Sequence, residues 1–339
     1  MAHIPASLNQ DPTSEYLKSK GYEMIHQGKV RDTFKIHDGE LLAVATDRIS
    51  IYEFVLNTKV PFKGACLTTL THFWMTKILT ELKNHLIPSV INPKYNAAYD
   101  LRENLLTGLN IRNCLVVQDL RGFMDLAELI FRKCFGGSVY DLYLETGEAA
   151  GVVVPLGLIK WQELPNALFT PTTKEAIGHD LPMTQKEYYD ITGNKGREFV
   201  KKLQAAFVTV QNHIASKGMI MLDTKLEGSS RLGILADECF TPDSSRICMR
   251  KDYEEAMAEN RNPRFKDKQF VREWGSKVPT PWGIGINNLS PENPDHLAFV
   301  DTLTVPKDVV MRTSFEYKDI VERVTGRELE RYQRSAMGV

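Results

Sequence analysis

The chain has 339 residues, more than one hydrophobic core usually holds, and this length favours two lobes. Its 42 Lys and Arg residues nearly balance its 43 Asp and Glu residues, which gives no support to nucleic-acid or membrane-surface binding through an overall charge. The five cysteines are scattered without a CxxC pair, which argues against a disulfide framework or a structural zinc site.

The N-terminal sequence and the apolar runs predict a cytoplasmic protein. Residues 1–12 lack the basic and apolar regions of a secretory signal. The most apolar run, 151-GVVVPLGLI-159, is short and is interrupted by Pro155, so no segment is predicted to cross a bilayer.

The first third of the chain reads as short strands separated by turns. Strands are predicted over 40–46 and 51–56, and His37-Asp38-Gly39 predicts a hairpin turn before the first of them. A helix is predicted over about 69–84, because apolar side chains recur there at spacings of three and four residues. We assign residues 14–115 to a smaller, β-rich lobe.

The rest of the chain, residues 116–339, is predicted to form a larger lobe. A strand over 114–120 is predicted to connect the two lobes. The further predicted elements, in chain order, are a strand over 127–135, a helix over 196–217, strands over 219–227 and 232–238, and a helix over 315–324. The region 146–195 is rich in Gly, Pro and Thr and is expected to be irregular. Because the strands are grouped rather than alternating regularly with helices, the predicted fold class is α+β.

Charged residues gather on the two late strands. Side chains alternate across a strand, so Asp223, Lys225 and Glu227 share one face. The following strand ends at Asp237, just before a loop rich in hydroxyl groups. Two carboxylates from neighbouring strands would suit Mg²⁺ bound to nucleotide phosphates, with the lysine on the γ-phosphate. The alternative is a solvated surface that carries a weak ion pair.

The hairpin between these strands decides whether Glu227 and Asp237 can reach one metal ion. Cross-strand partners share a face, so Asp223 is expected opposite Asp237, with Ser229-Ser230-Arg231 as a three-residue loop. A register shifted by one residue would send the two carboxylates to opposite faces.

Three further stretches carry groups suited to anionic ligands. The turn 28-GKVRD-32 could lay backbone N–H groups and cations over a triphosphate, and an ordinary turn is the alternative. The stretch 132-RKCFGGS-138 combines an arginine fork, a hydroxyl group and two glycines, and a structural turn is again the alternative. His179 and Asp180 lie in a non-periodic loop, where a histidine can equally be a surface residue.

Taken together in chain order, these motifs resemble one family, the SAICAR synthetases. The motifs that carry the resemblance are 28-GKVRD-32, 44-VATDRIS-50, 63-KGACLT-68, 170-TPTTK-174, 178-GHD-180, 223-DTKLE-227 and 237-DECFTPDSSR-246, and the likeness extends through 267-DKQFVREW-274 and 319-DIVERVTGREL-329. The resemblance implies a two-lobed α+β enzyme, distantly like kinases and ATP-grasp ligases, with ATP in the cleft between the lobes.

The resemblance also implies a reaction. Carboxyaminoimidazole ribotide (CAIR) and L-aspartate would be joined at the expense of ATP, with Mg²⁺, to give SAICAR, ADP and phosphate through an acyl phosphate in de novo purine biosynthesis. The implied partners are these small molecules, with no nucleic acid and no membrane, and a homo-oligomer is compatible with the sequence. The alternatives are a non-catalytic nucleotide-binding relative and a small-molecule phosphotransferase.

The family's site residues carry over to matching positions of this chain. The resemblance implies ATP binding by Lys29, Val30, Arg31, Val116, Gln118 and Lys225. It implies catalytic roles for Lys225, Glu227 and Asp237, with the two carboxylates holding the metal. It implies substrate binding by Arg132, Ser138, His179, Asp180, Asp243 and Arg246.

This sequence departs from the family pattern at three places. The usual DTKFEFG appears as 223-DTKLEGS-229, and the usual RGYxTGS appears as 132-RKCFGGS-138. Glu53 stands where an aspartate is expected after the DRIS motif. These departures bear on substrate affinity and fine geometry more than on the type of reaction.

Overall fold

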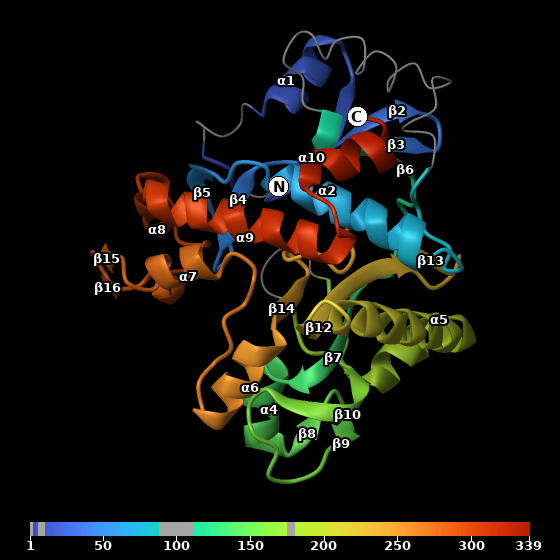
Figure 1. Cartoon of the computed structure of the whole chain (residues 1–339), viewed down its shortest axis with the longest axis vertical. Helices are drawn as coiled ribbons and strands as arrows, with labels where there is room; N and C mark the ends of the chain where they lie inside the picture. Colours follow the sequence, from blue (N-terminus) through green and yellow to red (C-terminus); the bar gives the residue numbers. More distant parts are fainter. Residues whose placement is uncertain (1–2, 6–10, 88–110, 175–179) are drawn as a thin grey trace. The chain divides into compact units, whose positions relative to one another are not determined.

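The computed structural model describes residues 3–5, 11–87, 111–174 and 180–339 (Figure 1). The chain divides into two compact units. The first comprises Met1–His72, Leu86–Asp119 and Asp267–Val339, and the second comprises Phe73–His85 and Leu120–Lys266. Both contain helices and antiparallel strands, which agrees with the predicted α+β class. The division differs from the predicted lobes because the last segment of the chain groups with the N-terminal unit and residues 73–85 group with the second.

The first unit contains a four-stranded antiparallel sheet in the order β1-β2-β3-β6. Its strands are β1 (Glu23–Gln27), β2 (Arg31–His37), β3 (Glu40–Ala45) and β6 (Cys114–Gln118). The predicted hairpin turn at 37–39 is confirmed, and Gly39 takes a left-handed φ of 79° there. Leu17 of helix α1 (Pro12–Ser19) packs with Phe34 and Val44 on this sheet.

A second core of the first unit surrounds a hairpin of β4 (Arg48–Ile51) and β5 (Phe54–Lys59). The single strand predicted over 51–56 is wrong, because Tyr52 and Glu53 turn the chain with φ values of 50° and 70°. Apolar residues of the returning C-terminal segment, such as Val271 and Val300, pack on this hairpin. This burial explains why that segment groups with the N-terminal unit.

The C-terminal segment is largely helical. Its elements are α7 (Gln269–Gly275), β15 (Pro279–Thr280), β16 (Gly283–Ile284), the 3₁₀ turn η6 (Ile286–Asn288), α8 (Pro294–Asp301), α9 (Lys307–Thr325), α10 (Leu329–Tyr332) and the π-helical turn η7 (Gln333–Met337). The helix predicted over 315–324 lies within α9 and begins earlier, directly after Pro306.

The helix predicted over 69–84 begins and ends earlier than expected. It consists of α2 (Lys63–Phe73) followed by the π-helical turn η2 (Trp74–Ile78). Asp47 accepts a hydrogen bond from the backbone N–H of Gly64 at 2.9 Å, which satisfies a donor of the first helical turn. A β carbon at Gly64 would lie 2.1 Å from the Ala45 carbonyl oxygen, so glycine is needed for this close approach.

The second unit is built on a six-stranded antiparallel sheet. Its strands are β7 (Ala127–Phe135), β10 (Gln162–Phe169), β11 (Thr172–Thr173), β12 (Met219–Ser229), β13 (Ile234–Ala236) and β14 (Ser245–Met249). β12 is central: one edge pairs with β7, while the other pairs with β14 along its first half and with β13 along its second. The shorter elements are a 3₁₀ turn η5 (Ile111–Asn113) in the first unit, and α4 (Ser138–Thr146), β8 (Glu148–Ala149), β9 (Val152–Val153) and α6 (Arg250–Ala258) in the second.

Helix α5 (Gln185–Ala215) lies along β12 (Figure 1). It begins at a capping box formed by Thr184 and Glu187, and it is interrupted at Gly193, whose φ of 63° and ψ of −148° are not helical, so its second segment starts close to the predicted residue 196. A β carbon at Gly228 would lie 2.7 Å from the ring of Phe199 in α5, so this face of the strand touches the helix. The region 146–195 is therefore more regular than predicted, since it contains β10, β11 and the start of α5.

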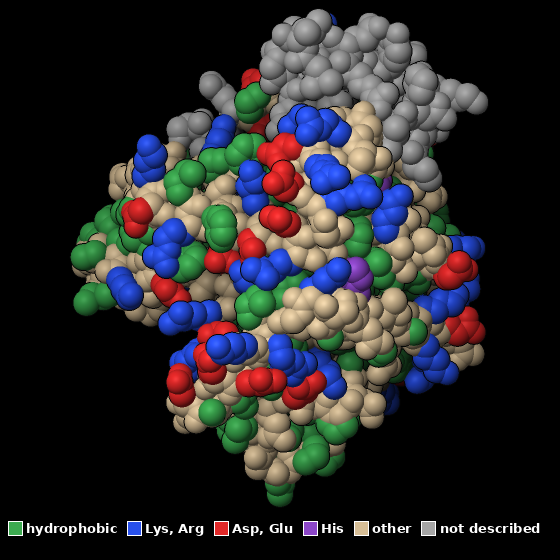
Figure 2. All heavy atoms as spheres, viewed as in Figure 1, with side chains coloured by type: hydrophobic (Ala, Val, Ile, Leu, Met, Phe, Trp, Pro, Cys, Tyr) green, Lys and Arg blue, Asp and Glu red, His purple; other side chains and the backbone are tan. Residues whose placement is uncertain are grey.

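The surface agrees with the balanced composition. Figure 2 shows Lys and Arg interspersed with Asp and Glu on the face that it presents. Within the described ranges, every helix is too short or too polar to cross a membrane.

Candidate active site

The charged face of β12 forms a network with its neighbour β7. Lys225 donates a hydrogen bond to Glu128 of β7, and its Nζ lies 4.0 Å from Glu227 Oε1. Glu227 also accepts a hydrogen bond from Lys174. Burial raises the pKa of Glu128, and the nearby Lys225 opposes that change. Burial alone would lower the pKa of Lys225, but Glu128 and Glu227 outweigh it and the pKa is raised, so the lysine stays protonated at neutral pH.

The predicted register of the following hairpin is wrong. Glu227 pairs with Ala236 and Ser229 pairs with Ile234, so residues 230–233 form the loop. The longer loop turns at Gly233, which has a left-handed φ of 66°. In this register strict alternation would place the side chains of Glu227 and Asp237 on opposite faces of the hairpin. However, β13 ends at Ala236 and Asp237 has a φ of 57°, so strand alternation does not set the direction of that side chain.

The carboxylates of this face fit the chemistry of a magnesium site. Glu128 and Glu227 are mostly buried, and each accepts a hydrogen bond from a lysine ammonium group, so a lysine already occupies the cation position beside each carboxylate. Mg²⁺ uses one or two carboxylates and fills its other positions with phosphate and water oxygens. Within the described ranges, no three His, Cys, Asp or Glu side chains form a cluster able to hold a metal ion by themselves. Such a site would depend on ligand oxygens.

Arg132 and Arg246, two of the residues for which the resemblance implies substrate binding, come together on the same face. Asp223 Oδ2 accepts hydrogen bonds from Arg132 Nη1 at 2.8 Å and from Arg246 Nη1. Arg132 Nε donates to Thr170 Oγ1 at 2.9 Å, and burial lowers the pKa of this guanidinium although Asp223 opposes the change. A β carbon at Gly137 would lie 3.3 Å from Nη1 of each arginine. The two guanidinium groups therefore lie beside the turn formed by Gly136 and Gly137, the glycine turn.

The other predicted substrate residues lie near this strand cluster or outside the described part. Ser138 is exposed and begins α4 directly after the glycine turn. Asp243 is half-buried in the turn that precedes β14, where its N–H donates to Thr241 Oγ1 at 3.3 Å. Asp180 is exposed, before α5. His179 lies outside the described residues.

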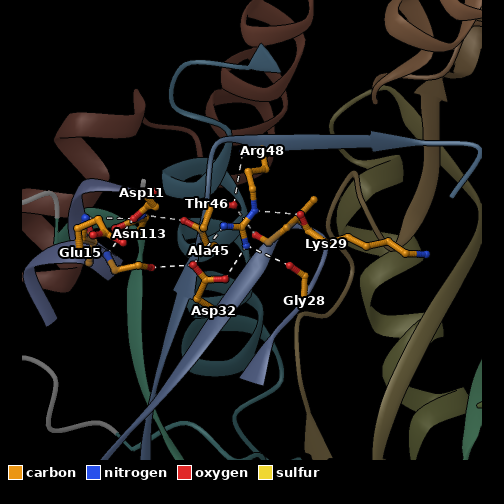
Figure 3. A network of polar contacts seen from close by, with 12 residues as sticks. Asp11, Glu15, Gly28, Lys29, Asp32, Ala45, Thr46, Arg48 and Asn113 are labelled. Atoms are coloured by element: carbon orange, nitrogen blue, oxygen red, sulfur yellow. Dashed lines mark hydrogen bonds and ion pairs between the residues drawn. The ribbon is translucent and has the colours of Figure 1, made fainter. Parts of the chain in front are cut away.

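In the first unit, a buried arginine holds the predicted phosphate turn. Arg48 donates from Nε to the Lys29 carbonyl and from Nη2 to the Gly28 carbonyl, both at 3.0 Å (Figure 3). Thr46 Oγ1 donates to the Val30 carbonyl at 2.9 Å. Arg48 and Thr46 therefore hold three successive carbonyl groups of the turn, and the Lys29 side chain extends away from them. Lys29 is ion-paired with Glu53, the residue that replaces the expected aspartate.

The position of the Arg48 side chain depends on Asp32. Its carboxylate binds Arg48 Nη2 at 2.6 Å and Arg48 Nη1 at 3.2 Å, and it accepts a hydrogen bond from Ser14 Oγ at 2.7 Å. The side chains of Arg48 and Asp32 are both 0% exposed. A guanidinium in such a place needs a paired carboxylate, because water cannot solvate it.

Asp32→Asn should therefore destabilise the protein by about 3–5 kcal/mol, because it leaves the Arg48 guanidinium buried without its counter-charge. Urea unfolding monitored by circular dichroism measures the change. Asp190→Asn is the matched control, since Asp190 forms an exposed pair with Lys186, and it should leave the unfolding midpoint near wild type. An Asp32→Asn midpoint equal to that of the control would contradict a structural role for the buried pair.

Arg31, Val116 and Gln118, the remaining predicted ATP residues, lie in the first unit. Arg31 is half-buried at the start of β2. Val116 is fully buried, with its side chain in the apolar core, and its carbonyl accepts a hydrogen bond from Ile87 at 3.0 Å. Gln118 is exposed at the end of β6.

Sequence reasoning missed Glu128, Lys174 and the Arg48–Asp32 pair as contributors. A signal for Glu128 was present: it is a charged residue within an apolar strand, four positions before Arg132 and therefore on the same face. Lys174 ends the 170-TPTTK-174 stretch, and only the tertiary structure brings it to Glu227.

Comparison with known proteins identifies the family. A sequence model of SAICAR synthetase matches residues 24–288. A phosphoribosylaminoimidazole-succinocarboxamide synthase of Thermodesulfovibrio yellowstonii is 32% identical over an alignment of 317 residues, and the match covers 90% of this chain and 96% of that protein. This chain belongs to the SAICAR synthetase family. A family member from Streptomyces avermitilis is likewise 32% identical, over 92% of this chain and 96% of its own length.

A solved SAICAR synthetase has the same fold. SAICAR synthase from Saccharomyces cerevisiae, complexed with SAICAR, superposes with a TM-score of 0.73 at 29% identity, covering 91% of this chain and 96% of the yeast chain. The fold and the sequence motifs of this SAICAR synthetase family member therefore agree along most of its length.

Proposed function

We propose that this protein joins CAIR to L-aspartate in de novo purine biosynthesis, converting ATP to ADP and phosphate and forming SAICAR. The observation that carries the proposal is the charged face of β12. Asp223 holds an arginine pair, while Lys225 and Glu227 lie further along the same face among carboxylates and lysines. One end suits an anionic substrate and the other suits nucleotide phosphates. Relatives at 32% identity are named for this activity.

The chemistry explains why both kinds of group are needed. A carboxylate is a poor acyl donor, so the γ-phosphoryl group of ATP passes first to the CAIR carboxylate, with ADP as the leaving group. The aspartate amine then attacks the acyl phosphate carbon, forms the amide and expels phosphate. Phosphoryl transfer depends on positioning and charge neutralisation more than on covalent help from the protein.

In this proposal Lys225 contacts the γ-phosphate, and Glu227 and Asp237 would hold Mg²⁺ together with phosphate and water oxygens. Bound Mg²⁺ would supply positive charge to the phosphate oxygens. Lys29, Val30 and Arg31 contribute to ATP binding from the turn anchored by Arg48, and Val116 and Gln118 contribute from β6. The distant kinase-like and ATP-grasp-like relationship and a cytoplasmic location belong to the same proposal.

The proposed substrate residues lie at the arginine end of this face. Arg132 and Arg246 pair with the negative groups of CAIR, and a guanidinium fork suits carboxylate and phosphate oxygens. Ser138 donates a hydroxyl hydrogen bond from the start of α4. Asp243 contributes from the turn before β14. His179 and Asp180 act in the loop before α5.

The direct test measures ADP release by the purified protein with ATP and Mg²⁺, adding CAIR and L-aspartate singly and together. We expect turnover with all substrates present and none when CAIR is omitted, because the acyl phosphate forms on CAIR. ATP binding without ADP release under the full conditions would favour a non-catalytic nucleotide-binding relative. ADP release that needs a hydroxylated acceptor instead of CAIR would favour a phosphotransferase.

A further inference from the structure

Trp161 has a backbone conformation that bulky residues rarely adopt. It directly precedes β10, and its φ is 66°. A large side chain is strained in this left-handed region, and such residues persist where the surrounding structure holds them, often beside functional groups.

Four contacts hold Trp161 in place. Its N–H donates to the Phe135 carbonyl at 2.7 Å, and its own carbonyl accepts from the Tyr253 hydroxyl at 2.9 Å. Its indole Nε1 donates to Asn262 Oδ1 at 2.7 Å. Its ring meets Phe265 edge-on, with centroids 5.4 Å apart. Together these contacts fix the plane of the indole.

The fixed indole borders the arginine end of the charged face. The guanidinium carbon of Arg246 lies 5.4 Å from the ring centroid, within the range of a cation–π interaction. A β carbon at Gly136 would lie 2.1 Å from the indole Cε3, so the ring also lies against the glycine turn before Ser138.

Arg246 needs such a support more than Arg132 does. Arg132 is nearly buried and donates to Thr170, to Gly136 and to Asp223. The Arg246 side chain is 35% exposed, and the carboxylate oxygen that binds it is shared with Arg132. A guanidinium on one shared oxygen can rotate about that contact, and an aromatic face restricts the rotation.

We infer that Trp161 is a positioning residue for the anionic substrate. It holds the Arg246 guanidinium in the orientation that receives CAIR, and its packing on Gly136 sets the course of the turn that leads to Ser138. The inference rests on the proposed function, because it takes Arg246 as a substrate ligand. Its consequence is selective: loss of the indole should weaken CAIR binding and spare ATP binding.

Steady-state kinetics with separate titrations of CAIR and ATP test this inference. Trp161→Leu should raise the CAIR KM about tenfold, the scale of a partly desolvated cation–π contact, and change the ATP KM less than about twofold. Trp161→Phe keeps an aromatic face without the Nε1 donor and should recover part of the loss. Trp282→Leu is the matched control, because Trp282 is 48% exposed in the β15–β16 hairpin, and it should change neither constant.

Two further variants keep the inference falsifiable. Asn262→Ala removes the Nε1 partner at an exposed position, so it should fold even if Trp161→Leu does not, and it should raise the CAIR KM by a smaller factor.

Arg246→Ala distinguishes the positioning role of Trp161 from the proposed function. If Arg246→Ala raises the CAIR KM while the Trp161 and Asn262 variants leave it at wild type, the positioning role is wrong and the proposed function stands. If Arg246→Ala also leaves it unchanged, both assignments are wrong. Equal rises in the CAIR and ATP KM values for Trp161→Leu would indicate general structural damage and would overturn the inference.

Discussion

Glu227→Gln should lower kcat for ADP formation by about 10²-fold or more, with CAIR and aspartate saturating, because a small misplacement of the γ-phosphate already costs that much. The substitution keeps the side-chain volume and removes the charge proposed to balance Mg²⁺. It also removes the negative partner of Lys174, whose side chain is 43% exposed and can turn to water. The thermal midpoint without ligands should therefore stay near wild type.

The measurement is ADP release as a function of Mg²⁺ concentration, together with thermal unfolding of the same samples. We expect a weakened Mg²⁺ dependence as well as the lower kcat. Glu255→Gln is the control, because Glu255 forms an exposed pair with Lys251 in α6 and should leave the kinetics unchanged. A Glu227→Gln protein that turns over at the wild-type rate would remove Glu227 from the metal assignment.

Asp223→Asn should have the second large effect, and it should act on both stability and substrate binding. Its carboxylate is the shared acceptor of Arg132 and Arg246, and the Arg132 side chain is only 5% exposed. Without that charge two neighbouring guanidinium groups repel each other, one of them in a buried place. We expect a loss of about 3 kcal/mol in unfolding free energy, the lower end of the cost of breaking a buried ion pair. The CAIR KM should rise more than the ATP KM.

A double-mutant cycle in urea separates charge from packing. Arg132→Met removes the buried cation, so Asp223→Asn should cost much less stability in that background than in the wild type. Asp190→Asn serves as the control, because Asp190 forms an exposed pair with Lys186. Additive effects of Asp223→Asn and Arg132→Met would show that the two side chains are not energetically coupled.

Local patterns in the sequence were sufficient for several parts of the site. The period of two along β12 placed Asp223, Lys225 and Glu227 on one face, because side-chain alternation depends only on the strand itself. The 37–39 turn was equally predictable, since glycine supplies the left-handed conformation there. The motifs also indicated the family, which the comparisons confirmed over residues 24–288.

The partners on that face were decided only by tertiary structure. Glu128 and Lys225 are 97 positions apart, and Arg132 and Asp223 are 91 apart. Such contacts depend on which strands pair and in which register, and no local periodicity contains that information. The predicted hairpin register was wrong for a local reason, because the loop spans residues 230–233 and turns at a left-handed Gly233 that the prediction did not use.

The sequence by itself therefore determined the kinds of groups on the charged face of β12 and their alternation along the strand. Tertiary structure decided that Asp223 is shared by two arginines, that Lys225 lies between two carboxylates, and that a strained Trp161 faces Arg246. Tertiary structure also groups residues 267–339 with the first unit. The physical reason is that local conformation follows from neighbouring residues, whereas burial and ion pairing depend on segments that only folding brings together.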